Sequence, residues 1–482
     1  MANKTRQPKP PLPPWKALAG LLAIAMAAMG MALVNLPWVA QLGVAAVAFW
    51  YLLDKPELAL AVQFNGVALF LYAIYKLNLE PDSTVTGSFY ALLAAAYLVG
   101  GWRAMRGRGL FRLGRIDAMF ILLYAMFFVS YLIFSLNNPL AYRKIVYAPL
   151  LVIAPYFGMQ MLVTREQLQR FFYYAAAMTV LMIPPSFYEL FANPLYAEYG
   201  RFSIYIFEDK GNNPIQYGIA FSILLIILLF HLSRRPRMLA LQIGLMLPSI
   251  YLLVRSGARG PLVSFVVVLL AYVVWIGGLR PKFRWVLLAV LAVLLVGSFR
   301  LIPDITSNFY QALVDPTQAP SADPSANSIQ ERMLLIDAAI REFLEHPIIG
   351  VGTGNSAGGT GYPHNSFVEV AAEFGLVGLV VFVALCGLIV QAAIRHLRGF
   401  ATASALGRRD WMMNLAFAFF LFAFVEGLFS AYMGGDMLFY VTASLVSVMA
   451  KLTEREKASE WEEQRIRYHE QRAEQWGQAP LA

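Results

Sequence analysis

The sequence predicts an all-α polytopic membrane protein with about 12–14 transmembrane helices. Hydrophobic residues make up 59% of the 482 residues and charged residues only 14%, whereas soluble chains average roughly 25% charged residues. The mean hydropathy is +0.59, and apolar runs of about 20 residues, the length that crosses a bilayer, recur from Trp15 to Ala450. This composition argues against a soluble enzyme, a nucleic-acid-binding domain and a disulfide-linked secreted domain. The single cysteine, Cys386, lies within an apolar run and has no partner for a disulfide within the chain.

Fourteen apolar segments are candidate membrane spans. In chain order they are 16–34, 36–53, 58–76, 86–101, 116–136, 144–163, 168–190, 214–232, 237–254, 261–279, 284–302, 366–392, 411–430 and 432–450. The apolar part of the first segment is longer than that of a signal peptide, so we expect this span to be retained.

The distribution of basic residues predicts the orientation. With both termini in the cytoplasm, 28 of the 38 Lys and Arg residues fall on the cytoplasmic side, as the positive-inside rule requires. The resulting organisation has seven segments: a cytoplasmic leader (1–15), N-terminal transmembrane helices (16–190), an outer loop (191–213), transmembrane helices (214–302), a large outer loop (303–365), C-terminal transmembrane helices (366–450) and a charged cytoplasmic tail (451–482).

The large outer loop is expected to contain one helix. A Pro-, Ala-, Ser- and Asp-rich stretch over Asp315–Ser328 is typical of flexible loop. The following segment, Glu331–Glu345, repeats apolar residues at helical spacing and predicts an amphipathic helix on the outer membrane surface. The glycine-rich run Gly350–Gly361 is expected to be loop.

Soluble-enzyme motifs are absent from the sequence, and the candidate chemistry lies in basic residues on the less basic, outer side. The turn YLLVRSGARGP over Tyr251–Pro261 holds Arg255 and Arg259. Pro261 suits the first turn of the next helix, so the two arginines flank a helix N-terminus, which favours anions. The alternative is that they are snorkelling anchors at the headgroup level.

A second basic residue, Arg201, precedes a similar helix start. It lies in YGRFSIYIFEDKGNNP, where Asn213 and Pro214 form a natural cap and first-turn pair. The alternative is a structured loop in which Arg201 pairs with Glu208 or Asp209.

The third candidate element is YPHNSFVE, over Tyr362–Glu369. Ser366-x-x-Glu369 fits a capping box, which predicts a structural role for Glu369. His364 stands immediately before this helix start, where the positive helix end keeps an imidazole neutral and able to accept a proton. The alternative is a histidine that is merely hydrogen-bonded within a loop.

Taken together, these residues predict an outward-facing site for a multiply charged anion beside a neutral base. Arginine suits phosphate because its planar guanidinium donates two parallel hydrogen bonds and stays charged. In a partly dehydrated pocket, losing one such donor costs roughly 10²–10³ in rate.

Three segments resemble the O-antigen ligase and polymerase superfamily as an ordered set over about residues 195–395. They are RFSIYIFEDKGNNPIQYG, SGARGPLVSFVVVLLAYVV, and ERMLLIDAAIREFLEHPIIGVGTGN followed by HNSFVEVAAEFGLVGLVVF. The resemblance implies a metal-independent glycosyltransferase of the bacterial inner membrane, without a cofactor, that moves a glycan from undecaprenyl pyrophosphate to an acceptor sugar hydroxyl at the periplasmic face.

The same resemblance assigns site residues. Arg201 and Arg259 match positions that bind the donor pyrophosphate, and His364 matches the position that serves the acceptor hydroxyl. Arg332 matches an arginine that often opens the loop helix, and Asn365 and Glu369 belong to the helix start as possible supporting residues. The sequence SGARG carries one residue more than the common Ser-Arg-Gly form, so Arg255 and Arg259 both stay open as the principal phosphate ligand. Attack opposite the pyrophosphate predicts inversion at the anomeric carbon.

Several functional alternatives stay open. The acceptor is a lipid A-core glycan for a ligase or another lipid-linked repeat for a capsule or exopolysaccharide polymerase. A transporter or flippase of the same anionic lipid would favour charged residues and broken helices within the spans; Asn65, Glu426 and the Pro184-Pro185 pair are the candidates. A metal-dependent glycosyltransferase would need paired acids in an early outer loop, where only Glu80 and Asp82 qualify.

Overall fold

The computed structural model describes residues 16–17, 19–20, 23, 38–76, 83–106, 113–192, 202, 214–231, 235–273, 324–359, 361–402, 411–429 and 436–477. Throughout these ranges the backbone forms helices joined by turns and loops, without a β-strand. The predicted all-α class is confirmed. The helices, with their bounds, are α2 (Trp38–Leu53), α3 (Pro56–Asn65), α4 (Val67–Lys76), α5 (Ser83–Met105), α6 (Arg115–Phe134), α7 (Pro139–Ala148), the π-helical turn η1 (Pro149–Ile153), α8 (Ala154–Gln160), α9 (Arg165–Ala192), α11 (Pro214–Phe230), α12 (Pro236–Arg255), α13 (Arg259–Ala271), α16 (Pro324–Glu345), the 3₁₀ turn η3 (Ser356–Gly359), α17 (Ser366–Thr402), α18 (Trp411–Gly427) and α19 (Met437–Gly477).

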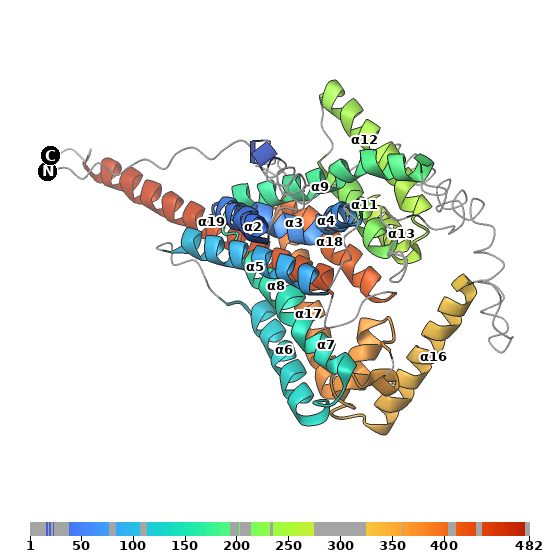
Figure 1. The fold of residues 1–482 in the computed structure, drawn as a ribbon. Coiled ribbons are helices and arrows are strands. Elements are labelled where there is room, and N and C mark those ends of the chain that lie inside the picture. The colour runs from blue at the N-terminus through green and yellow to red at the C-terminus, as the bar shows by residue number, and fades with distance from the viewer. Residues whose placement is uncertain are drawn as a thin grey trace.

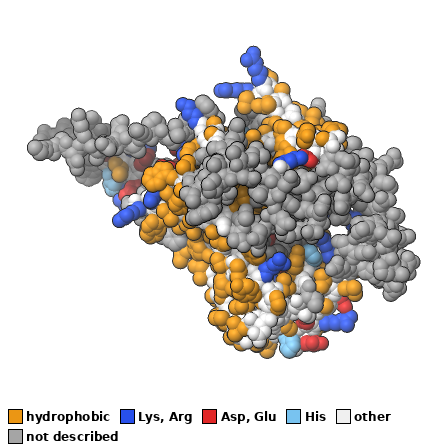
Figure 2. Space-filling view, viewed as in Figure 1, with side chains coloured by type: hydrophobic (Ala, Val, Ile, Leu, Met, Phe, Trp, Pro, Cys, Tyr) orange, Lys and Arg blue, Asp and Glu red, His pale blue; other side chains and the backbone are white. Residues whose placement is uncertain are grey.

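Within the described ranges, five helices are long and apolar enough to cross a membrane, namely α6, α9, α12, α17 and α19. Three shorter helices, α11, α13 and α18, are also apolar. Hydrophobic side chains dominate the described surface in Figure 2, as expected for helices that face acyl chains. The polytopic membrane class is therefore confirmed, whereas the number of 12–14 spans and the segment boundaries stay predictions. The candidate span 284–302 and most of 16–34 lie outside the described residues.

Helix breaks do not fall where the sequence suggested. The Pro184-Pro185 pair lies inside the continuous helix α9, although proline removes a backbone donor. The candidate span 58–76 is instead divided at Gly66 into α3 and α4. A second break lies at Gly375 within α17, whose φ of 63° and ψ of −158° are not helical. Both breaks lie at glycines, which disfavour a helix interior.

The large outer loop is more helical than expected at its start. Helix α16 begins at Pro324, so the last part of the stretch predicted to be flexible, 324–328, is helical. Proline at a first helical turn is well tolerated because its missing N–H would have no partner there. The predicted helix over Glu331–Glu345 is confirmed as the remainder of α16. Within the glycine-rich run, the described residues 350–359 and 361 form a loop with the short turn η3.

Aromatic side chains join helices that are distant in the sequence. The ring of Phe120 from α6 stacks on that of Tyr156 from α8 at 3.7 Å, and Tyr124 from α6 meets Tyr440 from α19 at 5.2 Å. These buried rings fix α6, α8 and α19 against one another through dispersion and edge-to-face contacts.

The bundle has two ends, which we call the tail end and the site end. At the tail end, Lys451 of α19 forms an ion pair of 2.5 Å with Asp117 at the start of α6, and Arg165 pairs with Glu456. The site end carries the end of α12 and the starts of α13, α17 and α19. Figure 1 shows α19 extending from the bundle toward the C-terminus. In the same view, the lower part of the bundle consists of α6, α7, α16 and α17.

Candidate active site

The two candidate arginines of the 251–261 turn lie at adjoining helix ends. Arg255 is the last residue of α12 and Arg259 the first of α13. The Ser256 hydroxyl donates to the carbonyl of Leu253 at 2.6 Å and accepts the N–H of Ala258 at 3.2 Å, which closes the turn. The Arg255 side chain is exposed and that of Arg259 half-buried.

The segment that contains Arg201 reaches the same turn. Arg201 itself lies outside the described residues, but the next residue, Phe202, donates its backbone N–H to the carbonyl of Arg255 at 3.0 Å. The Phe202 ring is buried against Tyr217 of α11. The structure thus brings the backbone beside Arg201 to Arg255, and α11 begins at Pro214, as its sequence suggests.

The start of α17 is capped differently from the expectation. The Asn365 side-chain oxygen accepts the backbone N–H groups of Phe367 and Val368 at 3.0 and 3.2 Å. Asn365 is therefore the N-cap and Ser366 the first helical residue, so the predicted capping box of Ser366 with Glu369 is wrong. The physical reason is that Glu369 is drawn into a buried ion pair with Lys144 at 2.5 Å, which supplies a positive partner for its carboxylate.

His364 adopts a left-handed backbone conformation, with a φ of 53°, directly before this cap. Its ring packs against that of Tyr362, with ring centroids 4.2 Å apart. Burial, and secondly the positive charge of Arg332, lower the pKa of His364 to about 4. The imidazole is neutral at physiological pH, as a general base requires, although burial rather than the helix end is the main cause.

The turn after α18 connects the starts of α13 and α17. Asn365 donates its side-chain amide to the carbonyl of Leu428 at 3.3 Å, and Arg332 of α16 donates to the carbonyl of Phe429 at 3.1 Å. Two residues before Leu428, the carboxylate of Glu426 accepts the hydroxyl of Ser264 in α13 at 3.3 Å. The segment 426–429, which is the end of α18 and the turn after it, therefore contacts Ser264 of α13, Arg332 of α16 and Asn365 before α17.

Glu426 is a site residue whose place the sequence did not reveal. It is buried, and a Cβ atom built on Gly260 would lie 2.7 Å from its Oε2. This carboxylate lies against the first turn of α13, immediately after Arg259. The anion-attracting N-terminus of this helix is consequently already accompanied by a negative charge from within the chain.

Comparison with known proteins places this region in a family. Residues 243–383 match the O-antigen ligase family. This part of the chain is therefore similar to the O-antigen ligase family. The matched part includes Arg255, Arg259, Arg332 and His364 but ends before Glu426. No curated protein matches the chain. This similarity over residues 243–383 supports a general role in glycan transfer at a membrane.

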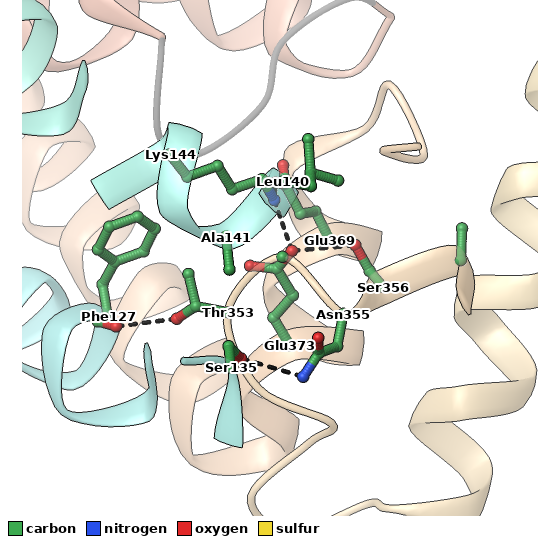
Figure 3. Close-up of polar contacts among 12 residues, drawn as sticks. Phe127, Ser135, Leu140, Ala141, Lys144, Thr353, Asn355, Ser356, Glu369 and Glu373 are labelled. Atoms are coloured by element: carbon green, nitrogen blue, oxygen red, sulfur yellow. Dashed lines mark hydrogen bonds and ion pairs between the residues drawn. The ribbon is translucent and has the colours of Figure 1, made fainter. Parts of the chain in front are cut away.

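A buried charged cluster that the sequence did not predict lies between α7 and the start of α17. The Lys144 ammonium lies 2.5 Å from Oε1 of both Glu369 and Glu373, and all three side chains are buried. Figure 3 shows Lys144 approaching the two glutamates from the neighbouring helix α7. One signal was present in the sequence, because two glutamates spaced i, i+4 within an apolar run require a buried positive partner.

Proposed function

We propose that this protein transfers an undecaprenyl-pyrophosphate-linked glycan to an acceptor sugar hydroxyl at the periplasmic face of the bacterial inner membrane. The observation that carries the proposal is the turn 426–429, which holds the start of α13, with Arg259, beside the start of α17, with His364. This shared contact supports a site in which a cationic group for a diphosphate and a neutral base stand at the starts of two helices that are held by the same segment.

The chemistry follows from these two groups. The acceptor hydroxyl oxygen attacks the anomeric carbon from the face opposite the leaving group, the carbon–oxygen bond to the pyrophosphate breaks, and the configuration inverts. The neutral imidazole of His364 takes the hydroxyl proton. The guanidinium groups of Arg201, Arg255 and Arg259 hold the pyrophosphate and stabilise the negative charge that it gains as it leaves. No metal ion is required in this scheme.

The carboxylate of Glu426 affects how a diphosphate can bind beside the start of α13. A diphosphate near the first turn of α13 meets the buried negative charge of Glu426, which opposes its binding. The helix dipole contributes only about 0.3–1 kcal/mol at an exposed site. The positive charge must therefore come from the arginine side chains.

The test is an in vitro transfer assay with the purified full-length protein in detergent or nanodiscs. The donor is a defined polyprenyl-pyrophosphate oligosaccharide, and the product is identified by mass. We expect His364→Ala and Arg259→Ala each to lower kcat/KM by about 10²-fold or more. His346→Ala and Arg341→Ala are matched controls on exposed residues near the end of α16 and should retain parental activity.

Near-parental transfer by both His364→Ala and Arg259→Ala would reject the proposal. Loss of transfer on addition of a chelator would reject metal independence.

The same assay separates the acceptor classes. A ligase transfers the glycan to a lipid A-core acceptor, whereas a polymerase extends a second lipid-linked repeat. A transporter of the lipid-linked glycan would move the donor across vesicles and yield no coupled product with either acceptor.

A further inference from the structure

The N-terminal part of α17 is a separate short helix over residues 366–374. The backbone at Gly375 leaves the helical region, so this half-helix is not rigidly continuous with the remainder of α17. It begins directly after His364 and Asn365. Because an isolated helix of this length is not stable by itself, its position depends on tertiary contacts.

The loop before the site holds the C-terminal end of the half-helix. Val351 and Gly352 donate their backbone N–H groups to the carbonyls of Ala372 and Glu373, each at 2.9 Å. Leu376, beyond the break, donates to the carbonyl of Pro347 at 2.7 Å. The backbone groups freed by the break thus have partners, as the low-dielectric setting of a membrane protein requires.

The cluster of Lys144, Glu369 and Glu373 holds one face of the half-helix, including its first turn. Glu369 and Glu373, spaced i, i+4, lie on one face of the half-helix, and Lys144 reaches both from α7. The Ser356 hydroxyl, from the loop that precedes the site, donates to Glu373 Oε1 at 3.0 Å. Figure 3 shows these contacts converging between α7, the loop and the half-helix. The cluster therefore adds a buried ionic link among α7, the loop and the half-helix.

We propose that Lys144 is a positioning residue, which clamps the half-helix through Glu369 and Glu373 and so sets the place of His364 at the site. The inference rests on the proposed function, since it concerns the base of that reaction. Lys144 acts through the half-helix and contacts neither donor nor acceptor. Glu369 lies in the first turn of the half-helix, closer to His364 than Glu373 does, so its ion pair governs the position of the base more directly.

The experiment measures kcat and the donor KM for Lys144→Met, Glu369→Gln and Glu373→Gln in the full-length protein, with folding followed by thermal unfolding in detergent. We expect Lys144→Met to lower kcat at least tenfold while the donor KM stays within about threefold of the parent, because the displaced group serves the chemical step. Lys451→Met is the matched control, since it removes a lysine from a buried aspartate at the tail end. It should lower thermal stability without lowering the kcat of the folded protein.

The two glutamine variants keep the test decisive if Lys144→Met does not fold. Each leaves Lys144 with one buried carboxylate, so the lysine keeps a partner of opposite charge. We expect Glu369→Gln to lower kcat more than Glu373→Gln, an order that a purely structural role would not produce. If the folded variants keep the parental kcat, or lose kcat and donor affinity in proportion, the clamp is rejected. If His364→Ala retains parental activity, the proposed function itself is rejected, whatever Lys144→Met does. If His364→Ala is inactive but Glu369→Gln keeps the parental kcat, only the role of Lys144 as a clamp is rejected.

Discussion

The side-chain amide of Asn365 donates a hydrogen bond of 3.3 Å to the carbonyl oxygen of Leu428. The same asparagine caps the start of α17 through its side-chain oxygen. One residue therefore satisfies donors at a helix start and an acceptor in the turn after α18. Because His364 precedes Asn365, this double role couples the position of the base to that of the turn 426–429.

Replacing Asn365 separates its two roles. Asn365→Ala removes the cap and the bridge to Leu428, and we expect a loss of about 0.5–2 kcal/mol in the free energy of unfolding together with a reduced kcat. Asn365→Asp keeps a capping oxygen but loses the amide donor, so it should retain most of the stability and still show the reduced kcat. Thermal unfolding and transfer kinetics measure the two effects. Equal kcat for Asn365→Asp and the parent would contradict a role of the bridge in catalysis.

The pKa of His364 predicts the acid limit of the reaction. Because this pKa is lowered to about 4, kcat/KM should stay constant as the pH falls through 6.5, the ordinary value for histidine, and decline only near pH 4. Arg332→Gln removes the second cause of the shift, so the acid limb should move upward without reaching 6.5, because burial persists. The measurement is the pH profile of kcat/KM for the parent, Arg332→Gln and the exposed control Arg341→Gln. An acid limb at the ordinary histidine value in the parent would contradict a lowered pKa for His364.

The break in α17 depends on a glycine. Gly375 has a positive φ, and a Cβ atom there would lie 2.4 Å from the backbone carbon of Ile348. Gly375→Ala should lower the free energy of unfolding by at least about 2 kcal/mol, because backbone strain and a clash with main-chain atoms add together. Gly387→Ala in the same helix is the control, since its Cβ meets nothing within 4 Å; it should leave stability unchanged or raise it by up to about 1 kcal/mol. Equal stabilities for the two variants would show that the break is not required.

The buried carboxylate of Glu426 should oppose donor binding. Glu426→Gln keeps an oxygen that can accept the Ser264 hydroxyl but removes the negative charge beside α13. We expect the dissociation constant of the pyrophosphate donor to fall by about two- to tenfold, as the loss of one partly screened repulsion predicts. Glu189→Gln, which alters an ion pair with Lys76 elsewhere, is the control and should leave the dissociation constant unchanged. Weaker donor binding by Glu426→Gln would mean that Glu426 orients the arginines rather than opposing the diphosphate.

Much of the local structure could be read from the sequence. The Asn-Pro pair before α11 and the apolar run after Ser366 predicted helix starts that the structure confirms. The cap of α17 was assigned to the wrong residue, because a capping-box pattern cannot show whether its glutamate has a stronger partner elsewhere. Glu369 does have one, in Lys144, which lies 225 positions away in the chain.

The amino-acid sequence by itself determined that this is an all-α membrane protein and placed most helices, because hydropathy and helical periodicity are properties of consecutive residues. It also singled out Arg255, Arg259 and His364 as candidates, since charged groups at apolar helix ends are conspicuous. Only the tertiary structure decided that Glu426 lies beside the start of α13 and that Lys144 holds the half-helix after His364. Such pairings form when segments that are distant in the sequence pack together and a buried charge requires a partner of opposite charge. A local sequence pattern does not specify which distant residue becomes that partner.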